Sequence, residues 1–136
     1  MKTFTFYLAT PERKIYEKKA LQITIPVLEG EITILPDHIP YIGALKSGEI
    51  MVQFEDGSRD YIAISSGFIE FSKNRLAVLV DTAERAEEID EERVKKAIER
   101  AKEAKEKKQL HETEYAILAS KLEKEFARLR VVRRKK

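Results

Sequence analysis

Few residue combinations in this chain could do chemistry, and the clearest is a neighbouring acid and imidazole. The chain has two histidines, His38 and His111, and no cysteine. Asp37 precedes His38, and a carboxylate beside an imidazole can serve in general acid–base catalysis. Prolines at positions 36 and 40 flank this pair, and a histidine in such a turn more often has a structural role. Because the two histidines also lack metal-ligand spacing, we expect neither a catalytic histidine nor a metal site.

Other catalytic signatures are missing from the sequence. It contains neither of the glycine-rich phosphate loops, G-x-x-x-x-G-K-[ST] or G-x-G-x-x-G. The serines of residues 65–67 (SSG) do not form the G-x-S-x-G nucleophile elbow. We therefore expect a protein that is not an enzyme by itself and requires no cofactor.

Positive charge is concentrated at the end of the chain. Residues 1–83 carry 9 basic and 11 acidic side chains, whereas residues 84–136 carry 17 basic and 13 acidic ones. The terminal cations are Arg128, Arg130, Arg133, Arg134, Lys135 and Lys136. Such an end suits an acidic partner surface, whether protein, phosphate or lipid headgroup. Two alternatives stay open: a solvated helix end whose cations suit the helix dipole, and a nucleic-acid-binding module, although few aromatics are interleaved.

The secondary structure that must position these residues is expected to change from strands to helices near residue 83. Every glycine and proline precedes that point, the last being Gly67. Seven stretches alternate apolar and polar residues, as strands do: 3–8, 21–27, 31–35, 50–54, 61–64, 68–71 and 76–80. An Asp-Gly pair at 56–57 favours a hairpin. Because no helical crossover fits between the strands, we expect no parallel sheet and predict an antiparallel β-sandwich, or flattened barrel, over residues 1–83.

Residues 84–136, which we call the arm, have the pattern of a two-helix hairpin. Asp90 is a suitable N-cap for the first helix. The predicted apolar faces are Val94, Ala97, Ile98, Ala101 and Ala104 in the first helix, and Tyr115, Leu118, Leu122, Phe126 and Leu129 in the second. The polar connection, residues 109–113, has no helix breaker, so one continuous helix is the alternative. Because alanine removes little area from water, we expect the arm to dock weakly and reversibly.

Three ordered motifs resemble the epsilon subunit of bacterial F-type ATP synthases. Residues 30–40 (GEITILPDHIP), followed by LKSG at 45–48, resemble the family signature G-E-x-G-I-L-P-x-H-x-P…L-x-x-G. Residues 61–68 (YIAISSGF) resemble its A-V-S-G-G-F strand and turn, and residues 83–93 (AERAEEIDEER) resemble its A-E-x-A-E-x-I-D linker. The match covers nearly the whole chain. Residues at which glycine is usual are here Thr33, Asp37 and Ser66.

The resemblance implies a non-catalytic rotor subunit of the central stalk. Its sandwich would contact the gamma subunit and the ring of c subunits, with Glu31 and His38 as polar c-ring contacts. Its arm would permit turnover when folded down, and would inhibit ATP hydrolysis when extended along gamma towards the catalytic alpha and beta subunits. These alpha and beta subunits form the catalytic head, and the resemblance implies that an acidic loop of the head would contact Lys124, Arg128, Arg130 and Arg133. The implied location is the cytoplasmic face of the bacterial cell membrane, through the complex alone, and no stretch approaches the ~18–20 apolar residues of a membrane span.

Some members of this family bind ATP in the folded-down state through an I/L-D-x-x-R-A motif. Residues 89–94 read IDEERV, with valine in place of the final alanine. The resemblance thus implies a regulatory ATP site made of Glu84, Ile89, Asp90, Arg93, Arg100, Lys124 and Arg128. An acid can accept hydrogen bonds from adenine or ribose, and cations suit phosphates, although Lys124 lacks the bidentate fork of the family's arginine. The alternative is that Asp90 is only an N-cap and Arg93 only a surface residue.

Overall fold

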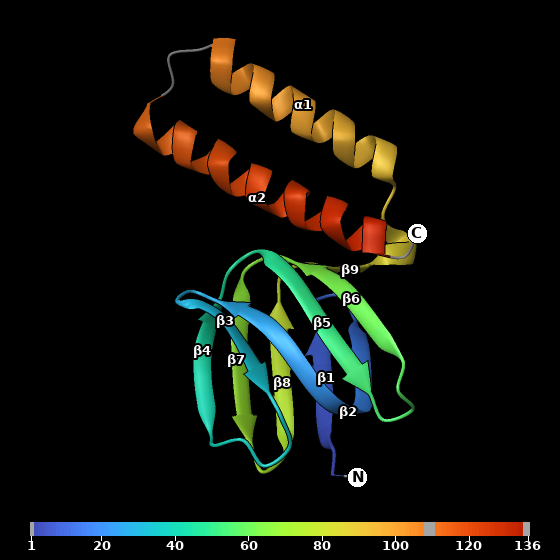
Figure 1. Ribbon diagram of the computed structural model, residues 1–136. Helices are drawn as coiled ribbons and strands as arrows, with labels where there is room; N and C mark the ends of the chain where they lie inside the picture. Colours follow the sequence, from blue (N-terminus) through green and yellow to red (C-terminus); the bar gives the residue numbers. More distant parts are fainter. Residues whose placement is uncertain (1, 108–110, 135–136) are drawn as a thin grey trace.

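The computed structural model describes residues 2–107 and 111–134, which form a closed β-body with two helices lying across one end (Figure 1). The strands are β1 (Phe4–Ala9), β2 (Lys14–Val27), β3 (Gly30–Ile34), β4 (Tyr41–Leu45), β5 (Gly48–Phe54), β6 (Arg59–Ile64), β7 (Gly67–Ser72), β8 (Arg75–Val80) and β9 (Ala83–Arg85). A short 3-10 helix, η1 (Ala86–Glu88), leads into α1 (Glu91–Lys107) and α2 (Glu112–Arg134). Within the described ranges no helix is long and apolar enough to cross a membrane.

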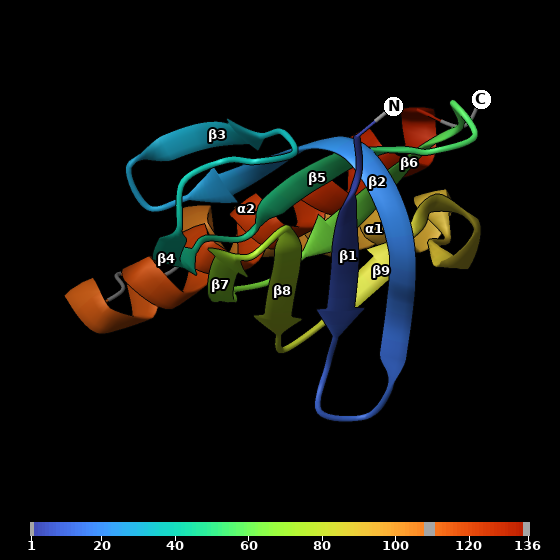
Figure 2. The same ribbon diagram turned by 90° about the horizontal axis from the view of Figure 1, so that it is seen from below.

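The strands form the predicted β-sandwich, closed into a flattened barrel. Their order is β1-β8-β7-β4-β2-β5-β6-β9, with β3 paired to β2. The 14-residue strand β2 also pairs with β1, so both ends of the β1-β8-β7-β4 ribbon attach to it (Figure 2). The predicted fold class is therefore confirmed.

One pairing differs from the antiparallel expectation. β1 runs parallel to β8, with Phe6 opposite Leu76 and Leu8 opposite Val78. A parallel pair needs a long connection, which in many sheets is a helix. Here the six strands between β1 and β8 make that connection. The absence of a crossover helix therefore did not exclude one parallel pair in a mixed sheet.

Alternation predicted the interior of the barrel well, except where the register shifts. Phe6 and Ile23 are fully buried, as expected. In β2 the register shifts between Ala20 and Gln22. As a result Ala20 enters the core, and the predicted Leu21 is only half-buried.

Three strand segments without clear alternation were not predicted. They are the first half of β2, the whole of β4, and β9. In β4, Tyr41 and Leu45 face the body core whereas Ile42 is 76% exposed, so apolar residues lie on both faces and the sequence does not alternate. These segments are strands because β1, β7 and β6 lie beside them to complete their hydrogen bonds. By contrast β5 and β6 form the hairpin predicted at residues 56–57.

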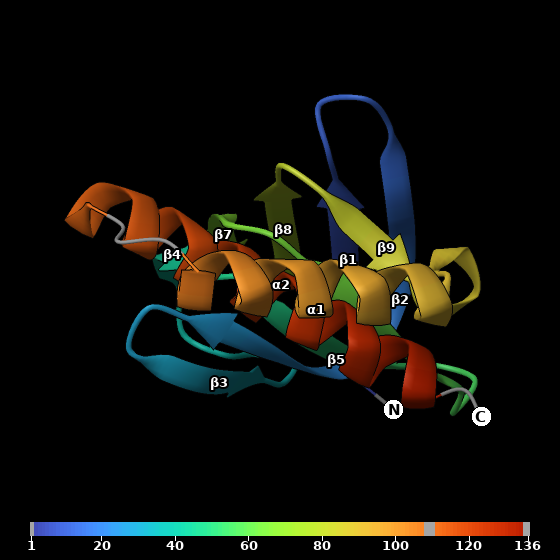
Figure 3. The same ribbon diagram turned by 90° about the horizontal axis from the view of Figure 1, so that it is seen from above.

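The two helices form the predicted hairpin and cover one end of the body. α2 lies between α1 and the strands, where it contacts β5, β6, β9 and η1 (Figures 1 and 3). Asp90 caps α1 as predicted, because its Oδ1 accepts the backbone N–H of Glu92 at 3.1 Å and of Arg93 at 3.3 Å. Residues 109 and 110 of the predicted connection lie outside the described residues.

The apolar faces of both helices follow the prediction except at the start of α2, since Leu118, Leu122, Phe126 and Leu129 belong to or pack against one apolar cluster. Val94, Ile98 and Ala101 are buried. Tyr115, which was predicted to be apolar contact surface, is 48% exposed, because the start of α2 projects past the strands (Figure 1). The residues that α2 buries are Leu122, Glu125, Ala127, Val131 and Val132.

Body and arm have separate hydrophobic cores. The body core fills the barrel and contains side chains from all nine strands. The arm core contains Ala63, Ala86, Ile89, Val94, Ile98, Ala101, Leu122, Val131 and Val132. Ala63, on β6, is the one fully buried member of this cluster that comes from β1–β8. The arm therefore packs on the outside of the barrel and completes none of its interior.

Candidate functional site

The junction of body and arm contains a polar pocket of about 560 Å³. Its lining residues come from β9, η1, α1 and α2, and they are Glu84, Glu88, Asp90, Arg93, Lys96, Ala97, Arg100 and Arg128. Five members of the predicted ATP site meet here: Glu84, Asp90, Arg93, Arg100 and Arg128. The other two do not line the pocket, because Ile89 is buried in the arm core and Lys124 lies one turn before Arg128 on α2.

Helix periodicity brings the cations of α1 to this pocket. Arg93, Lys96 and Arg100 follow one another at spacings of three and four, which places them on one face of the helix. The Arg100 Nε donates a hydrogen bond to the Lys96 carbonyl at 3.4 Å, and all three side chains remain exposed. The face therefore offers several cations to an anionic ligand.

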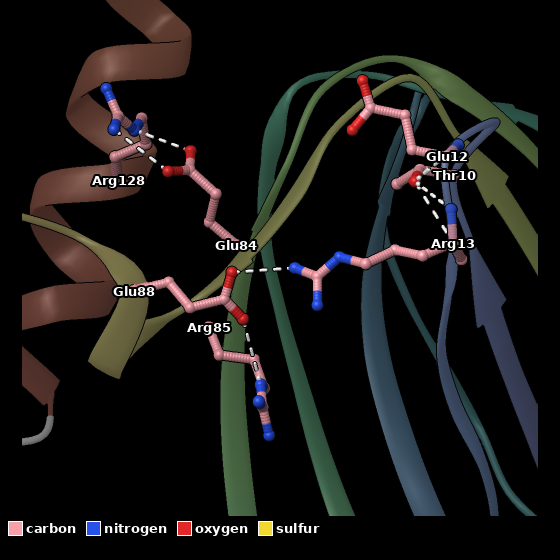
Figure 4. Close-up of polar contacts among 7 residues, drawn as sticks. All are labelled: Thr10, Glu12, Arg13, Glu84, Arg85, Glu88 and Arg128. Carbon is pink, nitrogen blue, oxygen red and sulfur yellow. Dashed lines mark hydrogen bonds and ion pairs between the residues drawn. The ribbon is translucent and has the colours of Figure 1, made fainter.

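Arg128 connects α2 to the last strand of the sheet through the Glu84 carboxylate (Figure 4), and it also pairs with Glu125 of its own helix. Its Nε lies 2.8 Å from one Glu84 oxygen, and its Nη2 donates to the other at 3.0 Å. Its Nη1 donates to both oxygens of Glu125, at 3.2 and 2.9 Å. Burial by itself lowers the pKa of the Arg128 guanidinium, but the hydrogen bonds and charges of Glu84 and Glu125 outweigh burial and raise it. Arg128 thus remains a cation that is already paired.

The composition of the pocket favours binding rather than catalysis. Its lining has three carboxylates and four cations. Carboxylates can accept hydrogen bonds from hydroxyl or amino groups, and guanidinium groups can bind phosphate in a bidentate way. The lining contains no histidine, serine or threonine that could act as nucleophile or proton carrier. Over residues 2–107 and 111–134, no cluster of acidic or histidine side chains could hold a metal ion.

A second ion-pair network fixes η1, the short helix that leads into α1. Glu88 accepts hydrogen bonds from Arg13 Nη2 at 2.9 Å and from Arg85 Nε at 3.2 Å (Figure 4). The turn that carries Arg13 is itself ordered by Thr10, whose Oγ1 accepts the Arg13 backbone N–H at 3.3 Å. Sequence reasoning missed this network and Glu125, because Arg13 and Glu88 are 75 residues apart and no local pattern relates them.

The basic end of α2 is engaged by the body and by α1. Arg134 makes two hydrogen bonds to Glu49, at 3.2 and 3.0 Å, and lies over the Tyr61 ring. Arg133 lies 4.0 Å from Glu91, at the start of α1. Of the four cations predicted to contact the catalytic head, Arg128 and Arg133 are therefore paired within this chain; Arg130 is exposed and Lys124 is half-buried.

The loop after β3 places the acid and imidazole in different environments. The Asp37 carboxylate accepts hydrogen bonds from Lys2 Nζ at 2.7 Å and Asn74 Nδ2 at 2.8 Å, whereas His38 Nδ1 lies 2.7 Å from the carbonyl of the following residue. The hydrogen bonds from Lys2, and then from Asn74, lower the pKa of the Asp37 carboxyl. Asp37 and His38 thus do not form a catalytic pair. The predicted c-ring contacts lie on this side of the barrel, with Glu31 exposed on β3 and His38 half-buried.

An apolar groove of about 590 Å³ lies on the outside of the barrel and was not predicted from the sequence. Leu28, Phe68 and Leu79 line it and are 63%, 67% and 53% exposed. Gly67 allows the chain to pass close here, because a Cβ at this position would lie 2.1 Å from the Leu79 carbonyl oxygen. An exposed apolar surface with this lining is typical of a protein-docking site.

Comparison with known proteins shows a family for this chain. A family model described as the β-sandwich domain of the ATP synthase delta/epsilon chain matches residues 3–86. The ATP synthase epsilon chain of Dichelobacter nodosus is 39% identical over 98 residues, which cover 72% of this chain and 68% of that one. The ATP synthase epsilon chain of Staphylococcus haemolyticus is 40% identical over 102 residues, which cover 74% and 76%.

Solved structures give the same picture of the fold. A chain in the Euglena gracilis mitochondrial ATP synthase, in an assembly of OSCP, F1 and c-ring, matches with a TM-score of 0.80 and 27% identity over 89% of this chain and 76% of that one. A chain from the central stalk and c-ring of the Tetrahymena thermophila mitochondrial ATP synthase matches with a TM-score of 0.57 over 96% and 94%. At 14% identity the second match shows the fold alone.

Proposed function

The chain belongs to the ATP synthase epsilon family, and we propose that it acts as a non-catalytic central-stalk subunit whose arm restrains ATP hydrolysis. In this role the body couples the gamma shaft to the c-ring, and the arm changes between a folded-down and an extended position. The complex would hold the chain at the cytoplasmic face of the bacterial membrane.

The observation that carries the proposal is the separation of the two hydrophobic cores. Detaching the arm would expose the arm core, to which the body contributes only Ala63 and the partly buried Tyr61. The barrel interior would stay closed. Because the body contributes so little apolar surface to the arm core, at roughly 25 cal/mol per Å² this contact stabilises docking only modestly. An arm held in this way can leave the body without unfolding it.

Charge pairing supports an exchange of partners when the arm moves. In the folded-down position Arg128, Arg133 and Arg134 pair with carboxylates of the body or of the arm itself. Arg133 and Arg134 are more than half or half exposed, and ion pairs at exposed sites contribute little and are screened by salt, so an acidic surface of the catalytic head can replace their present partners. The head contacts that we propose are Lys124, Arg128, Arg130 and Arg133.

The outside of the barrel supports the static contacts of the subunit. We propose that the apolar groove lined by Leu28, Phe68 and Leu79 docks on the gamma shaft. The polar side chains of Glu31 and His38 would contact the c-ring. An apolar groove suits a permanent contact, whereas a polar loop suits a ring surface that must also face water.

ATP is the proposed regulatory ligand of the junction pocket. The pocket takes Glu84 from β9 of the sheet as well as residues from both helices, so a ligand that bound there would stabilise the folded-down position by mass action. Calorimetric titration with ATP, with product release followed in the same samples, tests this part. Binding without hydrolysis, lost in Asp90→Ala and Arg93→Ala, is expected; an unchanged affinity in both variants would remove the pocket as the ATP site.

Locking the arm tests the main proposal directly. The chain has no cysteine, so Glu49→Cys with Arg134→Cys can be bridged by a short bismaleimide before assembly into the ATP synthase complex. The bridged complex should hydrolyse ATP faster than the unbridged one, because its arm cannot extend. Each single-cysteine variant, treated with the same reagent, is the control. Equal hydrolysis by bridged and unbridged complexes would contradict an inhibitory arm.

A further inference from the structure

Glu125 is a buried charge in an otherwise apolar interior. Its exposed fraction is 7%, and it is the one buried polar or charged residue among those that the structure describes. Moving a carboxylate out of water is costly unless it is paired and hydrogen-bonded. Its position is therefore one where a specific partner must be present.

That partner is the pocket guanidinium. Glu125 precedes Arg128 by three positions on α2, so the two side chains lie on the same face of the helix. Both Glu125 oxygens accept from Arg128 Nη1, at 3.2 and 2.9 Å. Glu84 occupies the other edge of the same guanidinium through Nε and Nη2. Two carboxylates thus share one cation, and both Nη1 and Nη2, which a phosphate would use, already donate hydrogen bonds to them.

We propose that Glu125 is an internal competitor for Arg128 and sets the affinity of the junction pocket for a nucleoside triphosphate. A phosphate group can reach the Arg128 fork only by displacing a carboxylate from it. Glu125 holds the guanidinium from within α2, so it remains a competitor whether or not the arm is docked. With Glu125 included, the four carboxylates around the pocket balance its four cations, so no positive excess is left to attract a polyphosphate. The inference rests on the proposed nucleotide pocket and deepens it.

The test compares two isosteric substitutions that remove the same charge from α2. Glu125→Gln removes the competitor but keeps the shape and one acceptor oxygen. Glu123→Gln is the matched control, because Glu123 is exposed, two residues away, and lines a different pocket. The full-length chain and both variants are titrated with magnesium ATP by calorimetry at one fixed salt concentration. Glu125→Gln should bind roughly tenfold more tightly than the wild type, as expected for one charge-assisted contact, and Glu123→Gln should bind as the wild type does.

A second pair of variants shows whether the gain acts through Arg128. In an Arg128→Ala background, adding Glu125→Gln should give no more gain than adding Glu123→Gln, because no shared cation is left. A tenfold gain that persisted without Arg128 would overturn the inference in favour of a general charge effect. Circular dichroism of each variant confirms that the helices are retained.

The outcomes separate this inference from the proposed function. Equal ATP affinities in wild type and Glu125→Gln would overturn the competitor role and leave the nucleotide pocket intact. No binding by either chain would overturn both the competitor role and ATP as the ligand. Whether the arm inhibits ATP hydrolysis would still be tested by the bridging experiment, which does not depend on ATP binding to this chain.

Discussion

The carboxylate of Glu84 on β9 and the guanidinium of Arg128 on α2 meet edge to edge, at 2.8 and 3.0 Å, although 44 residues separate them in sequence. This two-point contact joins the sheet to α2, and both side chains are about three-quarters buried. Bidentate pairs of this kind fix orientation as well as adding free energy. The pair therefore connects the pocket chemistry to the position of the arm.

Replacing Arg128 should loosen the arm. Arg128→Ala leaves Glu125 buried without its partner and removes the contact to Glu84. We expect the free energy of arm docking to fall by about 1–3 kcal/mol. Amide hydrogen exchange of α2 measures the change, and Arg130→Ala, at an exposed neighbouring cation, is the control. Equal exchange in the two variants would argue against a role for the ion pair.

Matched valine truncations should separate the two cores. Val131, in the arm, and Val52, in the barrel, are both fully buried. Val131→Ala should speed amide hydrogen exchange in α1 and α2, with a loss of about 1–3 kcal/mol in the free energy of protection. Exchange in the strands should not change. Val52→Ala should lower the global free energy of unfolding by a similar amount. If Val131→Ala also weakened protection throughout the barrel, the arm would not be an independent unit.

A side chain at position 67 should disturb the barrel. The Cβ of Gly67→Ala would lie 2.1 Å from the Leu79 carbonyl oxygen and 2.8 Å from the Val80 Cα, and both are backbone atoms that cannot move aside. We expect a loss of about 2–4 kcal/mol in urea denaturation. Gly57→Asn is the comparison, because φ there is +88° with no atom near, and asparagine tolerates positive φ. A Gly67→Ala variant as stable as the wild type would contradict the crowding at this position.

The loop contact of Asp37 should make stability depend on pH. Lys2 and Asn74 lower the pKa of the Asp37 carboxyl from its ordinary 3.8, and Asp37 raises the pKa of Lys2 from 10.5. A lowered carboxyl pKa stabilises the folded state above the ordinary pKa, and this contribution is lost as pH falls through the lowered one. The raised Lys2 pKa acts oppositely: its contribution is present below 10.5 and is lost as pH rises above the raised value.

Asp37→Asn tests this dependence. Urea denaturation should show the wild type more stable than the variant by a constant amount between about pH 5 and pH 9, and the difference should disappear at lower pH. The control is Asp81→Asn, at an exposed position in another turn. A difference between wild type and Asp37→Asn that persisted at pH 2 would rule out the charge as its source.

The apolar groove should be needed for assembly and not for folding. Phe68 is 67% exposed, so Phe68→Gln should change the free energy of unfolding by less than about 0.5 kcal/mol. Its affinity for the isolated gamma shaft should nevertheless fall roughly tenfold, as expected for a buried aromatic contact. Glu70→Gln, on the same outer face of β7 but outside the groove, should bind normally. Normal binding by Phe68→Gln would exclude this groove as the docking surface.

Local pattern in the sequence was enough for the elements and for many of their inward faces. Phe6 and Ile23 point into the barrel because alternate side chains of a strand lie on the same face, and the apolar face is the one that is buried. Asp90 caps α1 because its own oxygen reaches the free N–H groups two and three residues ahead. Such features depend on neighbours along the chain, and those neighbours are visible in the sequence.

Only the tertiary structure decided which distant residues meet. The parallel pairing of β1 with β8, the strand β4, and the contacts of Glu84 and Glu125 with Arg128 depend on how the barrel closes and where α2 lies. A carboxylate in a helix has the same local pattern whether it faces water or a guanidinium, so nothing in the sequence of α2 distinguishes Glu125 from Glu123. Burial distinguishes them, because in a low-dielectric interior an unpaired charge is costly and only the folded chain can bring it a partner.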